Sequence, residues 1–580
     1  MEFQRLKSNL KKDFTGLKPV KVAVLGDSAT QLLCMALRGY GWERGLDLCI
    51  HEAEYNQIDR EIHSADSALY EFEPDYTLLF PSTPKLLESF RKCDLRGRRE
   101  FAETYLARVA EWWSTLGQRG SCRVIQFNFG EVEDGAFGHF ANKVDHSFLF
   151  QLRKINCGLM ELAQRFPHVF INDVAALQAR MGYESAFSPQ TYVNADMVFG
   201  LDFFPHVAKG AVDTIAALLG FEKKCLILDL DNTVWGGIIG DDGLENIEIG
   251  DLGIGKAFTQ LQWWARQLKD RGIILAVCSK NDETIAREAF EKHPDMVLRI
   301  EDIAVFVANW KTKPENIRHI QSVLNIGFDS MVFLDDSPFE REMVRTALPQ
   351  VTVPELPADP AEYVPFLNAL NLFATASYSE EDSGRTQMYR EEAGRQELSS
   401  SVSSEDEFLA SLEMAATVTP FNKFNTPRVA QLSQRSNQFN LRTVRHSEQE
   451  IDDVSRSASC RTFAINLSDK FGNYGLISAV ILRRTDEAYF IDTWIMSCRV
   501  LRRGVEQFVL DRLVEAARED GVSKLVGEYL PTVKNGLVKD HYHNLGFHEA
   551  GEHWELSLSE YQQRQTHIAE TRAFITEKAA

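Results

Sequence analysis

Two aspartates stand directly after an apolar run in the segment CLILDLDNTVWGG. Asp229 and Asp231 follow residues typical of a buried strand, so both carboxylates are expected where this strand ends and its loop begins. Side chains alternate along a strand, which places these two on the same side and lets their oxygens share one hard cation. Mg²⁺ would offset the repulsion between the neighbouring carboxylates. The spacing predicts a magnesium-assisted site at a sheet edge, where open α/β sheets bind their ligands.

Other polar residues recur in the order used by phosphotransferases of the haloacid-dehalogenase (HAD) superfamily, which this region resembles. The resemblance implies that Asp229 attacks phosphorus and Asp231 acts as general acid/base. It also implies that Ser279 holds a phosphoryl oxygen and that Lys313, rather than Lys311, neutralises charge. The implied metal ligands are Asp229, Asp231, Asp335 and Asp336. Taken singly, DLDNT also fits an Asx turn and FLDDSP a capped helix start, but the ordered set favours phosphoryl transfer.

Longer strings resemble the FkbH-like family, a HAD-IIIC group. They are CLILDLDNTVWGGIIGDDG, AVCSKND, NWKTKPENI and FLDDSPFERE, and the resemblance continues through QLSQRSNQFNLRT, MSCRVLRRGVE and PTVKNGLVKDHYHNLGF, over residues 222–547. It implies a Mg²⁺-dependent enzyme that dephosphorylates 1,3-bisphosphoglycerate. The glyceryl group would pass through an enzyme thioester to the phosphopantetheine thiol of an acyl carrier protein, in polyketide-type biosynthesis. The stretch WGGIIGDDGLENIEIG leaves room for a small flap but no large lid, so the site would be open to a group carried by another protein.

Glyceryl transfer requires a thiolate, and three cysteines are candidates for it. Cys278 adjoins Ser279 at the expected catalytic end of its strand and is the first choice, although alternation points its side chain away from that of Ser279. Cys498 is the second candidate, if its domain faces the site. Cys225 lies further back along the strand that precedes Asp229, in a position typical of a core residue.

The C-terminal region resembles a GNAT-type acyltransferase, in which a glycine-containing loop binds the pyrophosphate of acyl-CoA. Here the loop runs from Arg499 to Gly504, and Arg502 replaces its first glycine. Its guanidinium groups would bind a phosphopantetheine phosphate or an acidic carrier protein; a solvated helix start is the alternative. The residues expected along a pantetheine tunnel, or alternatively in turns and caps, are Asn437, Gln438, Asn440, Thr532, Lys534 and Asn535, joined by Arg499, Arg503 and Gly504 of the loop.

The N-terminal region contains GDSAT, which resembles the nucleophile block of SGNH-type hydrolases. Ser28 occupies the serine position, and Asn128 in FNFGEVED is a candidate oxyanion donor. A Ser–His pair needs its histidine within reach, and only Asp202 with His206 resembles the required motif, with one extra residue between them. We therefore expect a degenerate SGNH-like domain that serves as a docking or scaffold module rather than a hydrolase.

The elements that must position these residues form a multidomain α/β protein. Strand patterns at KVAVLG, YTLLFP, RVIQFNF and HVFIND alternate with helices, and CLILDL, GIILAVCS, MVLRI and MVFLDDS begin a second parallel sheet. TFAINL, GLISAVILRR and EAYFIDTWIM precede the helix GVEQFVLDRLVEAARED in an α+β region. The expected divisions are an SGNH-like domain (1–215), a HAD-like domain (222–370), a connector (371–410), a GNAT-like domain (411–558) and a terminal helix or tail (559–580).

Composition limits the function further. A chain of 580 residues exceeds a single hydrophobic core, and a net charge of −21 argues against nucleic-acid or anionic-membrane binding. Scattered cysteines, a polar N-terminus and the lack of a long apolar stretch predict a cytoplasmic protein. The alternative function is a Mg²⁺-dependent HAD-type phosphatase fused to an acyl-CoA-dependent GNAT N- or O-acyltransferase; a non-catalytic scaffold is the third possibility.

Overall fold

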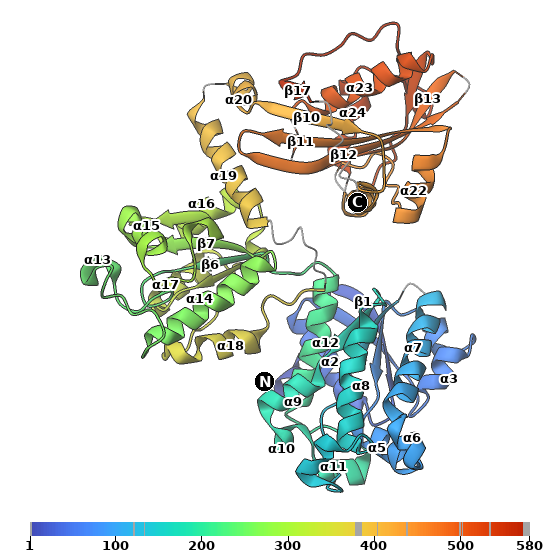
Figure 1. Cartoon of the computed structure of the whole chain (residues 1–580), viewed down its shortest axis with the longest axis vertical. Coiled ribbons are helices and arrows are strands. Elements are labelled where there is room, and N and C mark those ends of the chain that lie inside the picture. Colours follow the sequence, from blue (N-terminus) through green and yellow to red (C-terminus); the bar gives the residue numbers. More distant parts are fainter. Residues whose placement is uncertain are drawn as a thin grey trace. The chain divides into compact units, whose positions relative to one another are not determined.

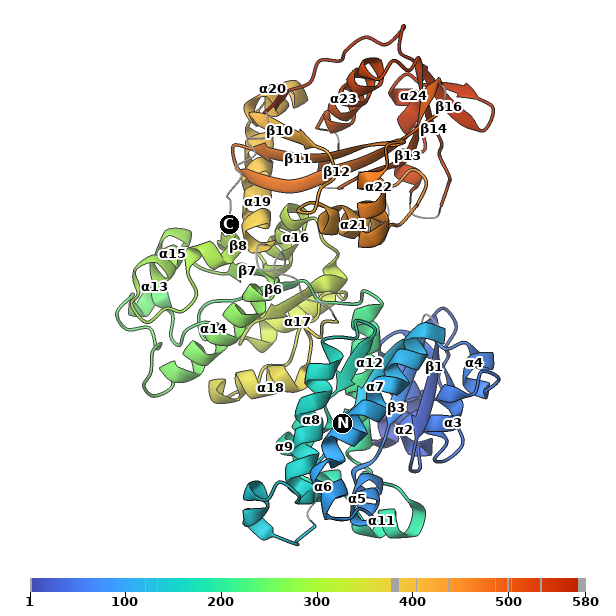
Figure 2. The ribbon, with the colours of Figure 1, turned by 45° about the vertical axis from the view of Figure 1, so that its right-hand side comes forward.

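A computed structural model describes residues 3–119, 122–132, 134–376, 385–402, 404–436, 439–485, 487–497, 500–501, 503–532 and 535–571. Internal contacts divide the chain into two compact units. The first comprises Met1–Lys224 with Glu362–Ser379, and the second Cys225–Ala361 with Glu380–Ala580. The first unit is built on one sheet and the second on two, so the α/β multidomain prediction is confirmed (Figures 1 and 2). None of the described helices is long and apolar enough to cross a membrane.

The sheet of the first unit has five parallel strands in the order β2-β1-β3-β4-β5. They are β1 (Lys18–Gly26), β2 (Leu46–Glu52), β3 (Tyr76–Phe80), β4 (Arg123–Phe127) and β5 (Val169–Asn172). One face packs against α1 (Phe3–Asn9), α2 (Gln31–Glu43) and α12 (Phe204–Leu218), and the other against α3 (Ile58–His63), α7 (Phe101–Arg119) and α8 (Phe148–Ala163). Buried apolar runs in β1, β3 and β4 explain this two-sided covering.

The segment that contains α18 (Tyr363–Leu370) belongs to the first unit, whereas the sequence placed it at the end of the HAD-like domain. Two hydrogen bonds attach it to α12: Lys209 Nζ donates to the Leu370 carbonyl at 2.8 Å, and Asn371 Nδ2 donates to Asp213 Oδ2 at 3.1 Å. The chain therefore returns to the N-terminal sheet after completing the second one.

The second sheet has four parallel strands in the order β8-β7-β6-β9. They are β6 (Cys225–Leu228), β7 (Ile274–Ser279), β8 (Ile303–Ala308) and β9 (Met331–Leu334), and the helices between and after them are α14 (Gly255–Asp270), α15 (Glu283–Lys292), α16 (Lys313–Leu324) and α17 (Pro338–Ala347). The strand predicted at MVLRI is wrong, because the strand is the later IAVFVA. The amides of Val297 and Leu298 instead bond to Gln262 Oε1 on α14, at 2.9 and 3.2 Å.

The third sheet is mixed, with the order β15-β16-β14-β13-β12-β11-β10-β17. Its strands are β10 (Met414–Thr419), β11 (Cys460–Asp469), β12 (Gly472–Arg484), β13 (Ala488–Met496), β14 (Lys524–Gly527), β15 (His548–Ala550), β16 (His553–Ser557) and β17 (Ile568–Glu570). Helix α23 (Val505–Glu519) packs on one face, and α21 (Thr426–Arg435) and α22 (Glu448–Arg456) pack on the other. The predicted terminal helix or tail instead contributes β17, which pairs in parallel with β10.

Helix α19 (Arg385–Ser401) lies in the predicted connector and contacts both sheets of the second unit. Tyr389 packs against the core of the second sheet, and Arg390 donates to the Glu301 carbonyl at 3.3 Å. Nearer its C-terminus, Arg395 forms a bidentate pair with Asp469 of β11 at 2.7 and 2.9 Å, and Leu398 packs against the third sheet's core. Helix α19 is therefore a structural part of both cores.

Candidate active site

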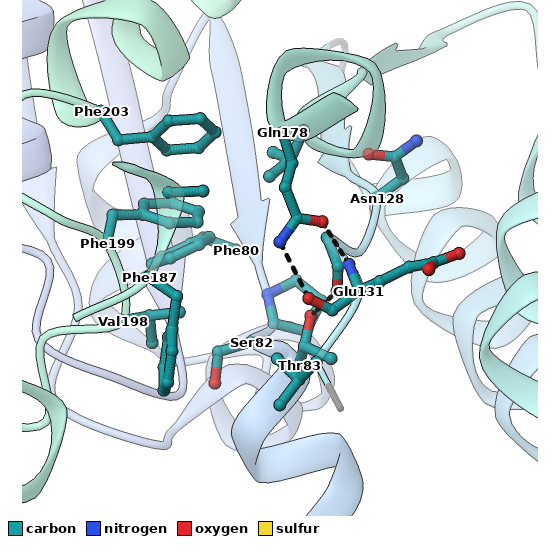
Figure 3. Close-up of a pocket in the computed structure, with 15 residues that line it drawn as sticks. Phe80, Ser82, Thr83, Asn128, Glu131, Gln178, Phe187, Val198, Phe199 and Phe203 are labelled. Carbon is teal, nitrogen blue, oxygen red and sulfur yellow. Dashed lines mark hydrogen bonds between the residues drawn. The ribbon is translucent and has the colours of Figure 1, made fainter. Parts of the chain in front are cut away.

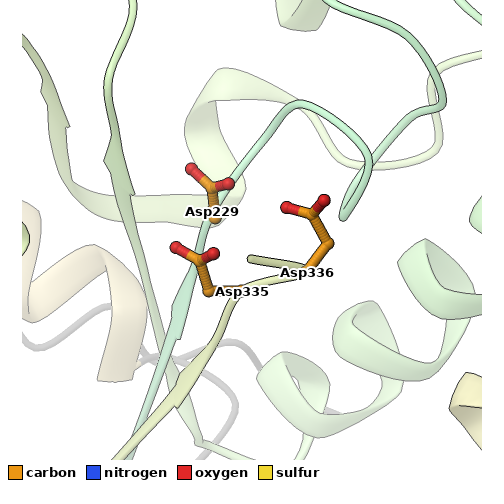
Figure 4. Close-up of side chains that lie close together, drawn as sticks. All are labelled: Asp229, Asp335 and Asp336. Carbon is orange, nitrogen blue, oxygen red and sulfur yellow. The ribbon is translucent and has the colours of Figure 1, made fainter. Parts of the chain in front are cut away.

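Three carboxylates converge at the carboxyl edge of the second sheet. Asp229 follows β6, and Asp335 and Asp336 follow the adjacent strand β9. Among the described residues, these three each place an oxygen within 4.8 Å of the other two (Figure 4). Burial, and then the charge of Asp229, raise the pKa of Asp335 to about 7 and raise that of Asp336. Such a group of oxygen ligands suits Mg²⁺, whose charge would offset their repulsion.

Lys313 is the buried cation of this site. It begins α16, where Thr312 and Glu315 form a capping box and Pro314 follows in the first turn. Its ammonium donates to Asp229 Oδ1 and to the Cys278 carbonyl at 2.7 Å, and lies 3.2 Å from Asp335 Oδ2. Burial opposes its charge, but Asp229 and Asp335 raise the pKa of Lys313 above its ordinary value. One lysine among three carboxylates leaves net negative charge, which fits the binding of a further cation.

The Asp231 carboxylate is held apart from the acidic cluster. Its Oδ1 accepts from Trp235 Nε1 at 2.9 Å and from the Ile239 amide at 3.1 Å, and its Oδ2 accepts from Asn281 Nδ2 at 2.9 Å. The expectation that this side chain is a metal ligand is corrected, because these three donors orient it elsewhere and it is not in the convergent group. Burial raises the pKa of Asp231, which favours holding a proton, as a general acid must.

Turns after the two strands fix the carboxylates. The chain reverses after β6 through Asn232, whose φ of 55° suits asparagine. Thr233 Oγ1 accepts from the Asp336 amide at 3.1 Å and so ties the two loops together. Beneath them, the buried Arg341 donates to the carbonyls of Asp335 and Asp336 at 2.8 and 2.7 Å. The carboxylate positions are thus set by the backbone rather than by flexible side chains.

A small flap follows the β6 loop, as the sequence predicted. Gly236 and Glu248 pair through two backbone hydrogen bonds of 3.0 and 2.9 Å, and the short helix α13 (Ile239–Asp242) lies between them. Gly237 adopts a φ of 86°, a conformation that favours glycine. The flap supplies the Ile239 amide to Asp231, so it is tied directly to the site.

Ser279 and Cys278 point in opposite directions from the end of β7. Cys278 packs with Cys225 and Ile317 in the core between the sheet and α16, and its side chain is fully buried. Burial raises the pKa of the Cys278 thiol to about 12, so almost none is thiolate at neutral pH. The expectation of a reactive Cys278 is therefore corrected, and Cys225 is buried in the same core. Alternation leaves buried Ser279 on the opposite face of the strand.

The residues predicted to bind pantetheine fall into two groups. Asn437, Gln438, Arg499, Arg502, Lys534 and the candidate thiol Cys498 lie outside the described residues. Among the others, Asn440 Oδ1 accepts from the Thr443 amide at 2.8 Å, and Asn535 accepts from the Thr532 amide at 2.7 Å and donates to the Asn440 carbonyl at 3.0 Å. These contacts match the turn role that the sequence left open.

The basic loop before α23 is also used within the fold. Arg503 donates to Tyr474 Oη and to Glu392 Oε1 of α19, the latter at 3.0 Å, instead of standing free for a phosphate. Gly504 is the N-cap residue of α23 and has a φ of 78°, in the left-handed region. The expectation that Arg503 binds substrate is corrected, because its charge is partnered by a helix distant in sequence.

The predicted hydrolase residues of the first unit do not form one pocket. Asn128 is one of the residues that line the pocket in Figure 3, where it lies on the side of Gln178, across from the aromatic side chain of Phe199. Its amide is engaged by α9 (Val174–Met181): Nδ2 donates to Asp173 at 2.8 Å and Oδ1 accepts from the Ala175 amide at 3.1 Å. Ser28 lines a different hollow, and neither hollow includes His206 or Asp202. Burial lowers the pKa of His206 to about 4.

Sequence reasoning missed the residues that orient Asp231 and the partner of Lys280. Trp235 and Asn281 each lie close in sequence to a predicted site residue, which was the available signal. Lys280 pairs with Glu340 Oε1 at 2.6 Å, a contact between the loop after β7 and the first turn of α17 that no local pattern reveals.

A known protein family and a solved structure resemble large parts of the chain. Residues 21–216 match the family described as FkbH, N-terminal domain. The N-terminal part of the protein BF1531 from Bacteroides fragilis, a crystal structure containing a phosphatase domain complexed with Mg, is 51% identical, covers 65% of this chain and 100% of its own, and has a TM-score of 0.63.

Smaller likenesses involve acetyltransferases. The ribosomal-protein-S18-alanine N-acetyltransferase from Escherichia coli is 16% identical over 26% of this chain and 98% of its own, and the spermidine N-acetyltransferase from Vibrio cholerae is 15% identical over 25% and 96%; both TM-scores are 0.21. No curated protein sequence matches the chain. The half-identical relative is covered in full and includes the phosphatase domain. The chain therefore carries a HAD-like phosphatase domain and belongs to the FkbH-like family.

Proposed function

We propose that this protein dephosphorylates 1,3-bisphosphoglycerate and transfers its glyceryl group to the phosphopantetheine thiol of an acyl carrier protein. The observation that carries the phosphoryl step is the convergence of Asp229, Asp335 and Asp336, with Lys313 paired to the first two. Mg²⁺ held by these three carboxylates would neutralise charge on the phosphoryl oxygens. Membership of the FkbH-like family supports the glyceryl step.

The phosphoryl step uses Asp229 as nucleophile. One of its oxygens forms a bond to phosphorus, the bond from phosphorus to the glyceryl oxygen breaks, and Asp231 gives a proton to that leaving oxygen. Water then attacks the aspartyl phosphate while Asp231 takes back a proton, and inorganic phosphate leaves. The three hydrogen bonds to Asp231 hold its carboxylate in one orientation through both transfers. Lys313 balances the negative charge of the phosphoryl group.

The acyl step requires a different group. A thiolate attacks the carbonyl carbon of the acyl phosphate, the carbon–oxygen bond to phosphate breaks, and the resulting thioester exchanges with the carrier thiol. Cys278 and Cys225 are buried in an apolar core. Of the three cysteines that the sequence brought forward, we therefore assign the thioester to Cys498. The small flap supports access by a carrier protein, because the described residues between β6 and α14 form no large lid.

The test combines phosphate release with intact-mass spectrometry. The protein is incubated with Mg²⁺, 1,3-bisphosphoglycerate and a phosphopantetheinylated acyl carrier protein. We expect a glyceryl mass on the carrier with the unaltered protein and with Cys278→Ser, no transfer with Cys498→Ser, and a retained 3-phosphate with Asp229→Asn. Phosphate release without any acyl adduct would leave a phosphatase and refute the glyceryl transfer. Unchanged phosphate release in Asp229→Asn would refute the phosphoryl mechanism.

A further inference from the structure

Few cations lie on the loops around the acidic cluster. In the described loops at the carboxyl ends of β6 to β9, up to the starts of the following helices, the lysines are Lys280, Lys311 and Lys313. Lys313 is buried and bonded to Asp229, and Lys311 is exposed. Lys280 directly follows Ser279, and its side chain is 36% exposed, compared with 2% for Lys313. Lys280 and Lys311 are both accessible, but Lys280 directly follows β7, which adjoins the strand of Asp229, whereas Lys311 follows β8, one strand further away. Lys280 is therefore the accessible lysine nearer to Asp229 in the strand order.

The ion pair of Lys280 spans the end of the nucleophile's strand. Lys280 follows β7, while its partner Glu340 lies in the first turn of α17, after β9. Strand β6, which leads to Asp229, lies between β7 and β9. Neighbouring strands are about 4.8 Å apart, so β7 and β9 are separated by roughly 10 Å at that edge. The 2.6 Å contact between Lys280 Nζ and Glu340 Oε1 therefore joins residues that follow the two strands on either side of β6.

Both residues of the Lys280–Glu340 pair can form further hydrogen bonds. Glu340 Oε2 is buried and finds no hydrogen-bond partner among the described residues. An ammonium group has three donors, so Lys280 can keep its bond to Glu340 and still bind a further anion. Its flexible side chain suits a group whose position varies between substrates. Glu340 thus positions the Lys280 ammonium at the edge of the site and leaves some of its N–H donors available to a further anion.

We propose that Lys280 is a specificity-determining residue that binds a second anionic group of the substrate, a phosphate or carboxylate remote from the phosphoryl group that reaches Asp229. This inference rests on the proposed phosphoryl transfer. An anionic substrate approaches a chain of net charge −21 and an acidic site, so a cation at the rim favours doubly anionic substrates over singly anionic ones. Glu340 acts as the positioning residue for this ammonium.

The experiment compares substrates that differ in one anionic group. Initial rates with Mg²⁺ are measured for glycerol 3-phosphate, 3-phosphoglycerate and 1,3-propanediol bisphosphate. The unaltered protein should prefer the last two over the first, and the two distinguish carboxylate from phosphate recognition. In Lys280→Met, this preference in kcat/KM should fall by roughly tenfold or more, the scale of one lost charge-assisted hydrogen bond, mainly through KM. Lys280→Arg should restore part of it.

Two further variants make the result decisive. Lys311→Met removes the same charge from a neighbouring exposed position and should leave the preference unchanged. Glu340→Gln keeps the ammonium but removes the charge that positions it, so it should weaken the preference for doubly anionic substrates by less than Lys280→Met does. Equal losses for all substrates in Lys280→Met, or the absence of a preference in the unaltered protein, would overturn the inference. If no phosphate ester is hydrolysed by the unaltered protein, the proposed phosphoryl transfer itself fails.

Discussion

Lys313→Met should destabilise the metal-free protein, because it removes the only side chain that the structure places between Asp229 and Asp335 as a counter-charge within the described site. The side chain of Lys313 is 2% exposed and that of Asp335 is 1% exposed, so water cannot replace the lost ammonium. Removing one partner of a buried ion pair costs about 3–5 kcal/mol, and methionine preserves the volume, which isolates the electrostatic effect.

The pKa of Asp335 determines whether the stability deficit of Lys313→Met grows or shrinks as pH rises. In EDTA, Asp335 has a pKa of about 7, raised chiefly by burial, so the folded protein binds a proton that the unfolded chain has released. This contribution to stability is present at low pH and is lost as pH rises from about 4 to 7, by up to about 1.4 kcal/mol per pH unit. Loss of Lys313 raises the pKa of Asp335 further. The stability deficit of Lys313→Met should therefore be larger at pH 8 than at pH 6.

The assay is urea-dependent hydrogen exchange of peptides that cover β6 and β9, with and without EDTA. Localised exchange is preferable to a single midpoint because a multidomain chain does not unfold in two states. Lys311→Met is the matched control and should change stability by no more than about 0.5 kcal/mol, as expected for an exposed side chain. Wild-type protection in Lys313→Met at pH 8, or a deficit that grows on acidification, would refute the reasoning.

Three other results are expected. Asp231→Asn should lower the rate of phosphate release by roughly 10²–10⁴-fold while leaving Mg²⁺ binding by calorimetry unchanged; weakened binding would return Asp231 to the metal ligands. Burial lowers the pKa of His541 to about 3, so the folded protein should lose stability as pH falls from 6.5 towards 3, by up to about 1.4 kcal/mol per unit, and His541→Phe should flatten that slope in acid titrations. Gly527→Ala should cost about 1–3 kcal/mol in urea melts because its Cβ would lie 2.3 Å from Tyr542 Cζ, whereas Gly536→Ala, with nothing within 4 Å, should not; equal costs would contradict the packing argument.

Much of the acidic site was predictable from sequence because its residues follow apolar strands of one parallel sheet. Parallel strands bring the residues that follow them to one edge of the sheet, whatever their separation along the chain. Asp229, Lys313 and Asp335 could therefore be assigned to one site from the sequence alone. Asp231 was misassigned as a ligand because alternation gives a direction but not the hydrogen-bond donors that the flap supplies. The expectation that Cys278 is reactive was wrong because side chains alternate along β7, which directs the Cys278 thiol into the core and away from the face of Ser279.

The remaining errors arose where side chains distant in sequence decide the outcome. MVLRI and IAVFVA are both apolar, and in the structure the amides of Val297 and Leu298 in the first segment bond to Gln262 on α14 instead of joining the sheet. Arg503 lies in a loop that fits anion binding, but Glu392 on α19 takes its charge. Periodicity contains no information about such partners, because they are set by how complete helices pack.

Helix α19 has a consequence for how the second unit unfolds. It contributes Tyr389 to one core and the buried Arg395–Asp469 pair to another, and severing the latter alone costs about 3–5 kcal/mol. Unfolding either sheet therefore removes packing contacts from the core of the other. The two sheets should therefore unfold cooperatively, because an interface energy couples them as it couples neighbouring repeats in a solenoid. A calorimetric scan should show them merged, and Arg395→Met should split the peak.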